Sequence, residues 1–386
     1  MKTTALCVAL TIVLATPAAA QLGGALGKIG KGVDTAKKVS DLFISEKDER
    51  AIGEAASRML IDRFGVVQDK ALTRYVTLVG KALAQETERA NLDWQFIVLD
   101  TDGVNAYAAP GGIVHITRGA LALIKSEAEL AGVLGHELTH VTAKHTVNAI
   151  RKNSGVQLAA QEGGAAAGGW GGALLSAAAS ATYDILIENK FDRNDEMQSD
   201  KVGITLANKV GYSPTGLSVF LTTLSERNKG RKEPNGLFAS HPQLKERIDE
   251  IAKIAKRDKL TATAMGEARY ASSVKVTAKA MGDIAMVTPG VKGVAGGSEA
   301  PKEEAKKEEP KKEEPKKEEP KRRGFGLGNL AGNLTQGGQK ESTQASASAG
   351  GRMVGPDTNA TGGSNKTPVR VTVTAAEIAE FKKGIA

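Results

Sequence analysis

The chain has 386 residues, enough for one large domain or two smaller ones, and 41 % of them are apolar, which permits a buried core. Aromatic residues are only 4 % and glycine is abundant (44), so part of the chain is not core-forming. The formal net charge is +8, but basic and acidic residues are interspersed, without a dense basic face carrying aromatics. This pattern argues against a nucleic-acid-binding protein.

Residues 1–20 have the pattern of a secretory signal peptide. Lys2 precedes an apolar run from Ala5 to Thr16, which is short for a membrane span, and small residues ending at Ala20 suit cleavage. The alternative is an uncleaved membrane anchor. Cys7 is the one cysteine of the chain, so a mature chain would have no disulfide. We therefore expect an exported, periplasmic protein that is cleaved after Ala20.

Helical periodicity dominates the next part of the chain. Residues 21–45 are rich in glycine and lysine and are expected to form an N-terminal arm. Apolar residues then recur at helical spacing over 46–64 and again over 70–90, and Gly65 is a suitable stop for the first of these helices.

Two short β-rich runs follow, from Trp94 to Leu99 and from Ile113 to Thr117. The Pro-Gly-Gly turn before the second run predicts a hairpin or an edge strand. An edge strand can hydrogen-bond an extended substrate through its backbone, whereas the alternative is an ordinary structural hairpin. The candidate substrate-binding residues are Asn105, Ala106, Tyr107, Gly111 and Gly112.

A histidine pair lies in the apolar-periodic run from Ser126 to about Ile150. On a helix, His136 and His140 lie on the same face, one turn apart, and two imidazoles in that geometry can bind one Zn²⁺. Glu137 would project beside the metal, where it could act as a general base. The alternative is a pair of ordinary helix histidines, so the prediction depends on a third ligand.

The stretch from Arg151 to Asp184 contains three Gly-Gly pairs among alanines, between Gly163 and Gly172. We consider a mobile flap or a loop in peripheral contact with a membrane, and equally a loosely packed helical hairpin. The next predicted helix, from Phe191 to Val210, carries two acidic residues one turn apart, Glu196 and Asp200, either a ligand with its supporting residue or a solvated acidic face.

The composition changes beyond about Ser273. We predict a weakly structured extension (273–297), a Lys/Glu/Pro repeat linker (298–323), a disordered Gly/Ser-rich segment (324–366) and a short strand–helix tail (367–386). The tail alternates over 369–373 like a strand and has helical character over 375–383.

Several motifs together resemble a known family. They are His136-Glu137-Leu138-Thr139-His140, residues 196–203, 211–214, Ser240-His241-Pro242 and Arg247-Ile248, with residues 105–112 and 117–120 upstream. The set resembles the zinc metalloprotease family of the CAAX prenyl protease and HtpX, which are gluzincins with an HExxH motif, and is closest to the soluble periplasmic BepA-like and Oma-like members. The resemblance covers roughly residues 46–256.

The resemblance implies an α+β fold: a mostly helical zincin-type metalloprotease domain over 46–272, with a small β-sheet whose edge strand lines the cleft. It implies one Zn²⁺ per subunit, bound by His136, His140 and Glu196, with Glu137 as the catalytic general base.

The resemblance also assigns supporting residues. Asp200 and Arg247 would lie behind the ligands, and His241 would lie close to the metal, where it would stabilise the oxyanion or regulate access. The chain departs from the family pattern at Ser199, which stands where an alanine usually precedes the aspartate, a small change that should not disturb the zinc site. The membrane-embedded members have several transmembrane helices that this chain lacks, which favours the exported subgroup.

These observations predict a hydrolase: an exported zinc metalloendopeptidase that cleaves unfolded or misassembled cell-envelope proteins in protein quality control. Its expected partners are polypeptide substrates and envelope or outer-membrane assembly proteins. The alternative is a chaperone or scaffold in which the metal site is mainly structural or latent.

Overall fold

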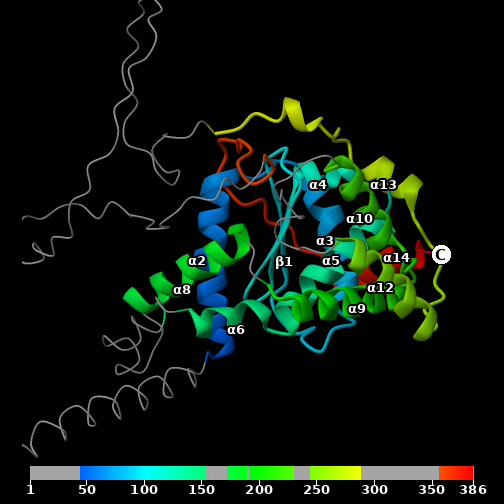
Figure 1. Ribbon diagram of the computed structural model, residues 1–386, viewed down its shortest axis with the longest axis horizontal. Helices are drawn as coiled ribbons and strands as arrows, with labels where there is room; N and C mark the ends of the chain where they lie inside the picture. The colour runs from blue at the N-terminus through cyan, green and yellow to red at the C-terminus, as the bar shows by residue number, and fades with distance from the viewer. Residues whose placement is uncertain are drawn as a thin grey trace, which may run out of the picture. The chain divides into compact units, whose positions relative to one another are not determined.

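The computed structural model describes residues 44–153, 156, 172–188, 191–229, 244–287 and 356–385. The predicted signal peptide, most of the arm and of the glycine-rich stretch, His241 and the repeat linker lie outside these residues. The described elements are α2 (Glu46–Phe64), α3 (Lys70–Ala84), β1 (Gln95–Leu99), β2 (Ala106–Ala109), β3 (Ile113–Thr117), α4 (Arg118–Leu123), α5 (Glu127–Thr142), α6 (His145–Lys152), α8 (Gly172–Glu188), α9 (Arg193–Val210), α10 (Gly216–Arg227), α12 (Leu244–Arg257), α13 (Glu267–Ser273), a 3₁₀ turn (Met281–Asp283) and α14 (Ala375–Lys383) (Figure 1).

The sheet has the order β1-β3-β2, so β1 and β2 are its two edges. β1 runs parallel to β3, with Gln95 opposite Ile113, and β2 runs antiparallel to β3, with Ala106 opposite Ile116. The predicted hairpin is therefore β2–β3. Of its two strands, β2 lies at an edge, whereas β3, the run for which an edge position was considered, is the central strand. A small mixed sheet in a mostly helical domain confirms the predicted α+β class.

The two faces of the sheet pack against different helices. Phe96 and Val98 of β1 lie in the larger apolar core with residues of α3 and α5, whereas Ile97 and Leu99 pack with residues of α2 and α8. This alternation follows from the two-residue period of a strand. In Figure 1, α2 and α8 lie on one side of β1, and α3 and α5 on the other. Among the described helices, none has the length and apolar character that a membrane span requires.

The C-terminal segment from residue 356 to residue 385 packs on this domain. Asp357 is buried and forms a two-point ion pair with Arg227, and its carboxylate also accepts the backbone N–H of Val104. The N–H of Gly363 donates to the carbonyls of Phe64 and Asp100. Residues 356–366 therefore differ from the predicted disordered segment, because a buried charge pair and backbone hydrogen bonds tie them to the domain.

The tail beyond this point differs in part from its prediction. The expected strand over 369–373 does not form, since these residues pair in no sheet, while α14 forms over the expected residues and packs on α3. Arg269 lies over the ring of Phe381 and donates to its carbonyl, which fixes α14 to α13.

Removing the carboxylate of Asp357 should destabilise the whole domain. In Asp357→Ala, Arg227 would keep its charge in a site where its side chain is only 10 % exposed. We expect the free energy of unfolding in urea to fall by about 3 kcal/mol. Glu380→Ala, which removes an exposed ion pair with Lys383, is the control and should change it by less than about 0.5 kcal/mol. Equal stability of the two variants would contradict a structural role for this segment.

Candidate metal centre

The centre is built on α5, which is shorter than predicted. Ser126 caps the helix by accepting the N–H of Glu129. The helix ends at Thr142 instead of continuing to about Ile150, because Lys144 adopts a left-handed conformation (φ 58°) and α6 then starts at His145. The chain therefore turns one residue before a third histidine.

Two glycines allow α5 and α9 to approach each other closely. A Cβ added to Gly135 would lie 2.7 Å from the carbonyl oxygen of Gly203, and one added to Gly203 would lie 2.7 Å from the backbone nitrogen of His136. Both distances are too short for a real side chain. The small residues at this crossing set the distance between the histidines of α5 and the acidic first turn of α9.

His136, His140 and Glu196 come together where the two helices cross. The Nε2 atoms of the two histidines are 3.1 Å apart, and the Glu196 carboxylate oxygens lie 3.6 Å and 3.5 Å from them. A tetrahedral zinc ion with bonds of about 2.0–2.2 Å separates its ligand atoms by about 3.3–3.5 Å. Two imidazoles and one carboxylate, all buried, therefore fit a catalytic-type metal site.

Asp200 and Arg247 lie directly behind these three residues. Nδ1 of His136 donates to Asp200 (2.8 Å), which leaves Nε2 facing the cluster. Arg247 is buried, donates to both oxygens of Asp200 at 2.7 and 2.6 Å, and lies 3.1 Å from Glu196. Burial alone would raise the pKa of Asp200, but the charge of Arg247 and the His136 hydrogen bond outweigh it and lower this pKa to about 2.

Glu137 follows His136 on α5 and is buried, with 2 % of its surface exposed. Its charge adds to those of Asp200 and Glu196 around the Arg247 guanidinium, and together they raise the pKa of Arg247 although burial lowers it. Three carboxylates thus surround one fixed cation beside the two histidines.

Sequence reasoning missed a contact of His145. Its Nδ1 lies 3.0 Å from Nδ1 of His140, and its Nε2 lies 3.2 Å from the amide oxygen of Gln198. A metal on Nε2 of His140 requires the proton on Nδ1, so His145 would accept this hydrogen bond and orient the ring. The HELTHVTAKH spacing shows the histidine, but the turn at Lys144 brings it into contact.

His115 and the candidate substrate-binding residues lie in or next to the sheet. His115 is buried in β3 and hydrogen-bonded to Ser57, and burial lowers its pKa to about 4. The five candidate substrate-binding residues form β2 and its flanking turns and are all buried. Thr146 of α6 donates to the outward carbonyl of Ala108, so part of the β2 edge is covered in this structure.

The crossing of α5 and α9 gives a direct test of the site geometry. Gly203→Ala should force the helices apart, lower the free energy of unfolding by about 1–3 kcal/mol and weaken Zn²⁺ binding at least tenfold, measured by competition with a chromogenic chelator. Gly282→Ala is the control, since a Cβ there meets nothing within 4 Å. Unchanged zinc affinity in Gly203→Ala would show that this crossing does not set the ligand distances.

Comparison with known proteins agrees with this geometry. Residues 70–255 match the model of Peptidase family M48. This range is just under half of the chain, and over it the sequence is similar to that family. The match contains α5, α9 and most of α12, and it confirms the predicted resemblance.

Named proteases are among the relatives. The chain is 24 % identical over 251 residues to the beta-barrel assembly-enhancing protease of Yersinia pestis, covering 64 % of this chain and 52 % of the relative. It is 27 % identical to the metalloprotease YcaL of Escherichia coli (57 % and 87 %) and 30 % identical to the mitochondrial metalloendopeptidase OMA1 of Schizosaccharomyces pombe (46 % and 52 %). The chain spans about half the length of the beta-barrel assembly-enhancing proteases that it matches.

Proposed function

We propose that this protein is a zinc-dependent metalloendopeptidase with one Zn²⁺ per subunit. The observation that carries the proposal is the convergence of His136, His140 and Glu196, whose ligand atoms lie within 4.8 Å of one another, beside the buried carboxylate of Glu137. A histidine–histidine–glutamate set with a neighbouring general base is the arrangement that peptide hydrolysis at zinc requires.

Each residue has a distinct task in this mechanism. The two histidines and Glu196 would hold the metal, which when bound polarises the scissile carbonyl and the attacking water. Glu137 takes the proton from that water and delivers it to the nitrogen of the departing amine. Asp200 keeps His136 in the tautomer whose Nε2 is free for the metal, and Arg247 neutralises the carboxylates behind it.

The substrates that we propose are unfolded or misassembled proteins of the cell envelope. The names of the beta-barrel assembly-enhancing proteases support a link to outer-membrane assembly, and residues 1–20 support export to the periplasm. Backbone pairing with the β2 edge, from Asn105 to Gly112, would accept many sequences once Thr146 releases Ala108. His241 remains our candidate for oxyanion stabilisation or for control of access to the metal.

Metal removal tests the proposal. Dialysis of the full chain against 1,10-phenanthroline should abolish hydrolysis of casein, and one equivalent of Zn²⁺ should restore it, with bound zinc measured by inductively coupled plasma mass spectrometry. Hydrolysis by protein containing less than about 0.1 zinc per chain would contradict the proposal. A protein that binds one zinc and suppresses aggregation of unfolded substrates without cleaving them would support the chaperone alternative.

A further inference from the structure

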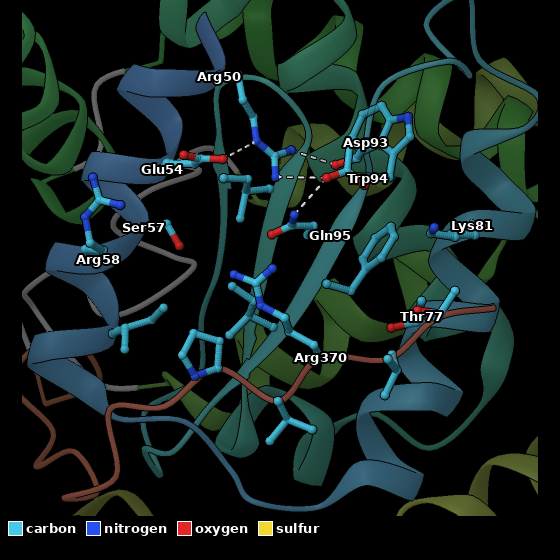
Figure 2. A pocket seen from close by; sticks show the side chains of 18 of the residues that line it. Arg50, Glu54, Ser57, Arg58, Thr77, Lys81, Asp93, Trp94, Gln95 and Arg370 are labelled. Atoms are coloured by element: carbon cyan, nitrogen blue, oxygen red, sulfur yellow. Dashed lines mark hydrogen bonds and ion pairs between the residues drawn. The ribbon is translucent and has the colours of Figure 1, made fainter. Parts of the chain in front are cut away.

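The outer edge of β1 lies in a slot between α2 and α3 (Figure 2). The slot is a cavity of about 740 Å³, within the range of about 300–1,000 Å³ usual for ligand sites. α2 and α3 form its walls, Trp94 to Ile97 lie at its base, and residues 366–372 of the C-terminal segment close one end. β1 is the sheet edge opposite β2, so the slot is separate from the edge strand that contacts α5 and accepts the hydrogen bond of Thr146 from α6.

Among the described residues, one residue of β1 has backbone hydrogen-bonding groups without a backbone partner on the side of this slot. The N–H of Gln95 donates to Gly112 on the β3 side, while the carbonyl of Val98 accepts from Val67 on the other side. Because backbone groups alternate in direction along a strand, both the N–H and the C=O of Phe96 point outward, away from β3. Within the described residues, no backbone partner pairs with Phe96 on this side. An added strand could therefore pair with β1 at this position.

The slot has an excess of positive charge. Five cationic side chains line it (Arg50, Arg58, Lys81, Lys366, Arg370) and only three anionic ones (Glu54, Asp62, Asp93). Arg50 is already paired with Glu54 and Asp93. The other four cations form no ion pair recorded among the described residues, and Asp62 is the one acidic side chain left beside them. Figure 2 shows the guanidinium of Arg370 directed into the slot, on the side facing Arg50 and Gln95.

We propose that this slot binds a short, extended, acidic polypeptide segment, whose backbone pairs with Phe96 of β1 and whose carboxylates contact Arg58, Lys81 and Arg370. Strand addition supplies affinity through main-chain hydrogen bonds, while the cations select acidic side chains. If the proposed proteolytic function holds, the slot would retain a substrate at a distance from the metal. The binding itself does not depend on that function.

The alternating peptide acetyl-Val-Glu-Val-Glu-Val-Glu-amide, labelled with fluorescein, is a suitable probe, with fluorescence anisotropy as the readout on the full chain. We expect saturable binding that weakens with salt, and a Kd at least tenfold higher for the double variant Arg58→Glu/Arg370→Glu. The matched control is Lys253→Glu/Lys383→Glu, which makes the same change of net charge at exposed positions on α12 and α14. Equal affinity of the two double variants would overturn the proposal.

A second peptide tests the strand pairing independently. N-methylation of the central residues removes backbone donors but keeps the charges, and it should weaken binding at least tenfold. Binding unaffected by N-methylation would overturn strand addition. A Val-Lys peptide that bound as tightly as the Val-Glu peptide would overturn the acidic preference. These assays measure peptide binding only. Absence of peptide binding would overturn the proposed slot but not the zinc-dependent hydrolysis of casein. Absence of casein hydrolysis would likewise not affect the conclusion about peptide binding.

Discussion

Glu137→Gln should lower casein hydrolysis about a thousandfold while the protein keeps its fold and its zinc. The change replaces a proton-accepting carboxylate by an amide of nearly the same size, so the general base is removed but no cavity is left in the core. Glu137 is buried beside the metal-site residues but is not one of the three whose atoms converge. Activity measured with fluorescein-labelled casein, together with bound zinc per chain, checks both parts of the prediction.

The control for this variant is Glu250→Gln, on the solvent side of α12, where the carboxylate interacts with Lys253. It should retain activity within about twofold. Casein hydrolysis by Glu137→Gln at the wild-type rate would refute the proposed base. Loss of activity accompanied by loss of zinc would show instead that Glu137 supports the metal site.

Arg247→Met should destabilise the domain by about 3–5 kcal/mol and weaken zinc binding. The guanidinium is buried and lies against Asp200 and Glu196, so its removal leaves two buried carboxylates without their cation. The change also frees Asp200 to rotate, and Asp200 is the residue that orients His136. Urea denaturation of the zinc-free protein measures the stability, and chelator competition measures the affinity.

Arg193→Met provides the matched control, because its partner Glu246 lies in an exposed ion pair on the surface. We expect a loss of less than about 1 kcal/mol there. If Arg247→Met were no less stable than Arg193→Met, the buried pair would make no net contribution to stability.

The same pair makes stability depend on pH. The pKa of Asp200 is about 2 in the folded protein, below its ordinary value of 3.8, so this carboxylate stabilises the fold above about pH 4. That stabilisation is lost as the pH falls from about 4 through 2. In Arg247→Met the pKa of Asp200 should rise, because burial is then opposed by less charge, and acid unfolding should begin at a higher pH. Circular dichroism at a series of pH values in zinc-free buffer would detect the shift.

The sequence by itself determined most of the metal site. His136 and His140 share a helix face because four residues make about one turn, and Glu137 follows from the same helix. Spacing also indicated Glu196 and Asp200 as candidates, but only the resemblance to a protease family favoured a ligand over a solvated acidic face, since charged pairs one turn apart are common on helices. Local periodicity also predicted α2 and α14 closely, because both have strong caps and regular apolar spacing.

Tertiary structure decided the distances and the unexpected neighbours. The ligand spacing depends on the contact between Gly135 and Gly203, which are 68 positions apart in the chain. The contact of His145 depends on one left-handed residue, Lys144, whose conformation no periodicity indicates. The placement of residues 356–385 depends on Asp357 meeting Arg227. In the first and third cases, the energy comes from a long-range contact that does not exist until the chain has folded, so local sequence patterns carry no signal for it.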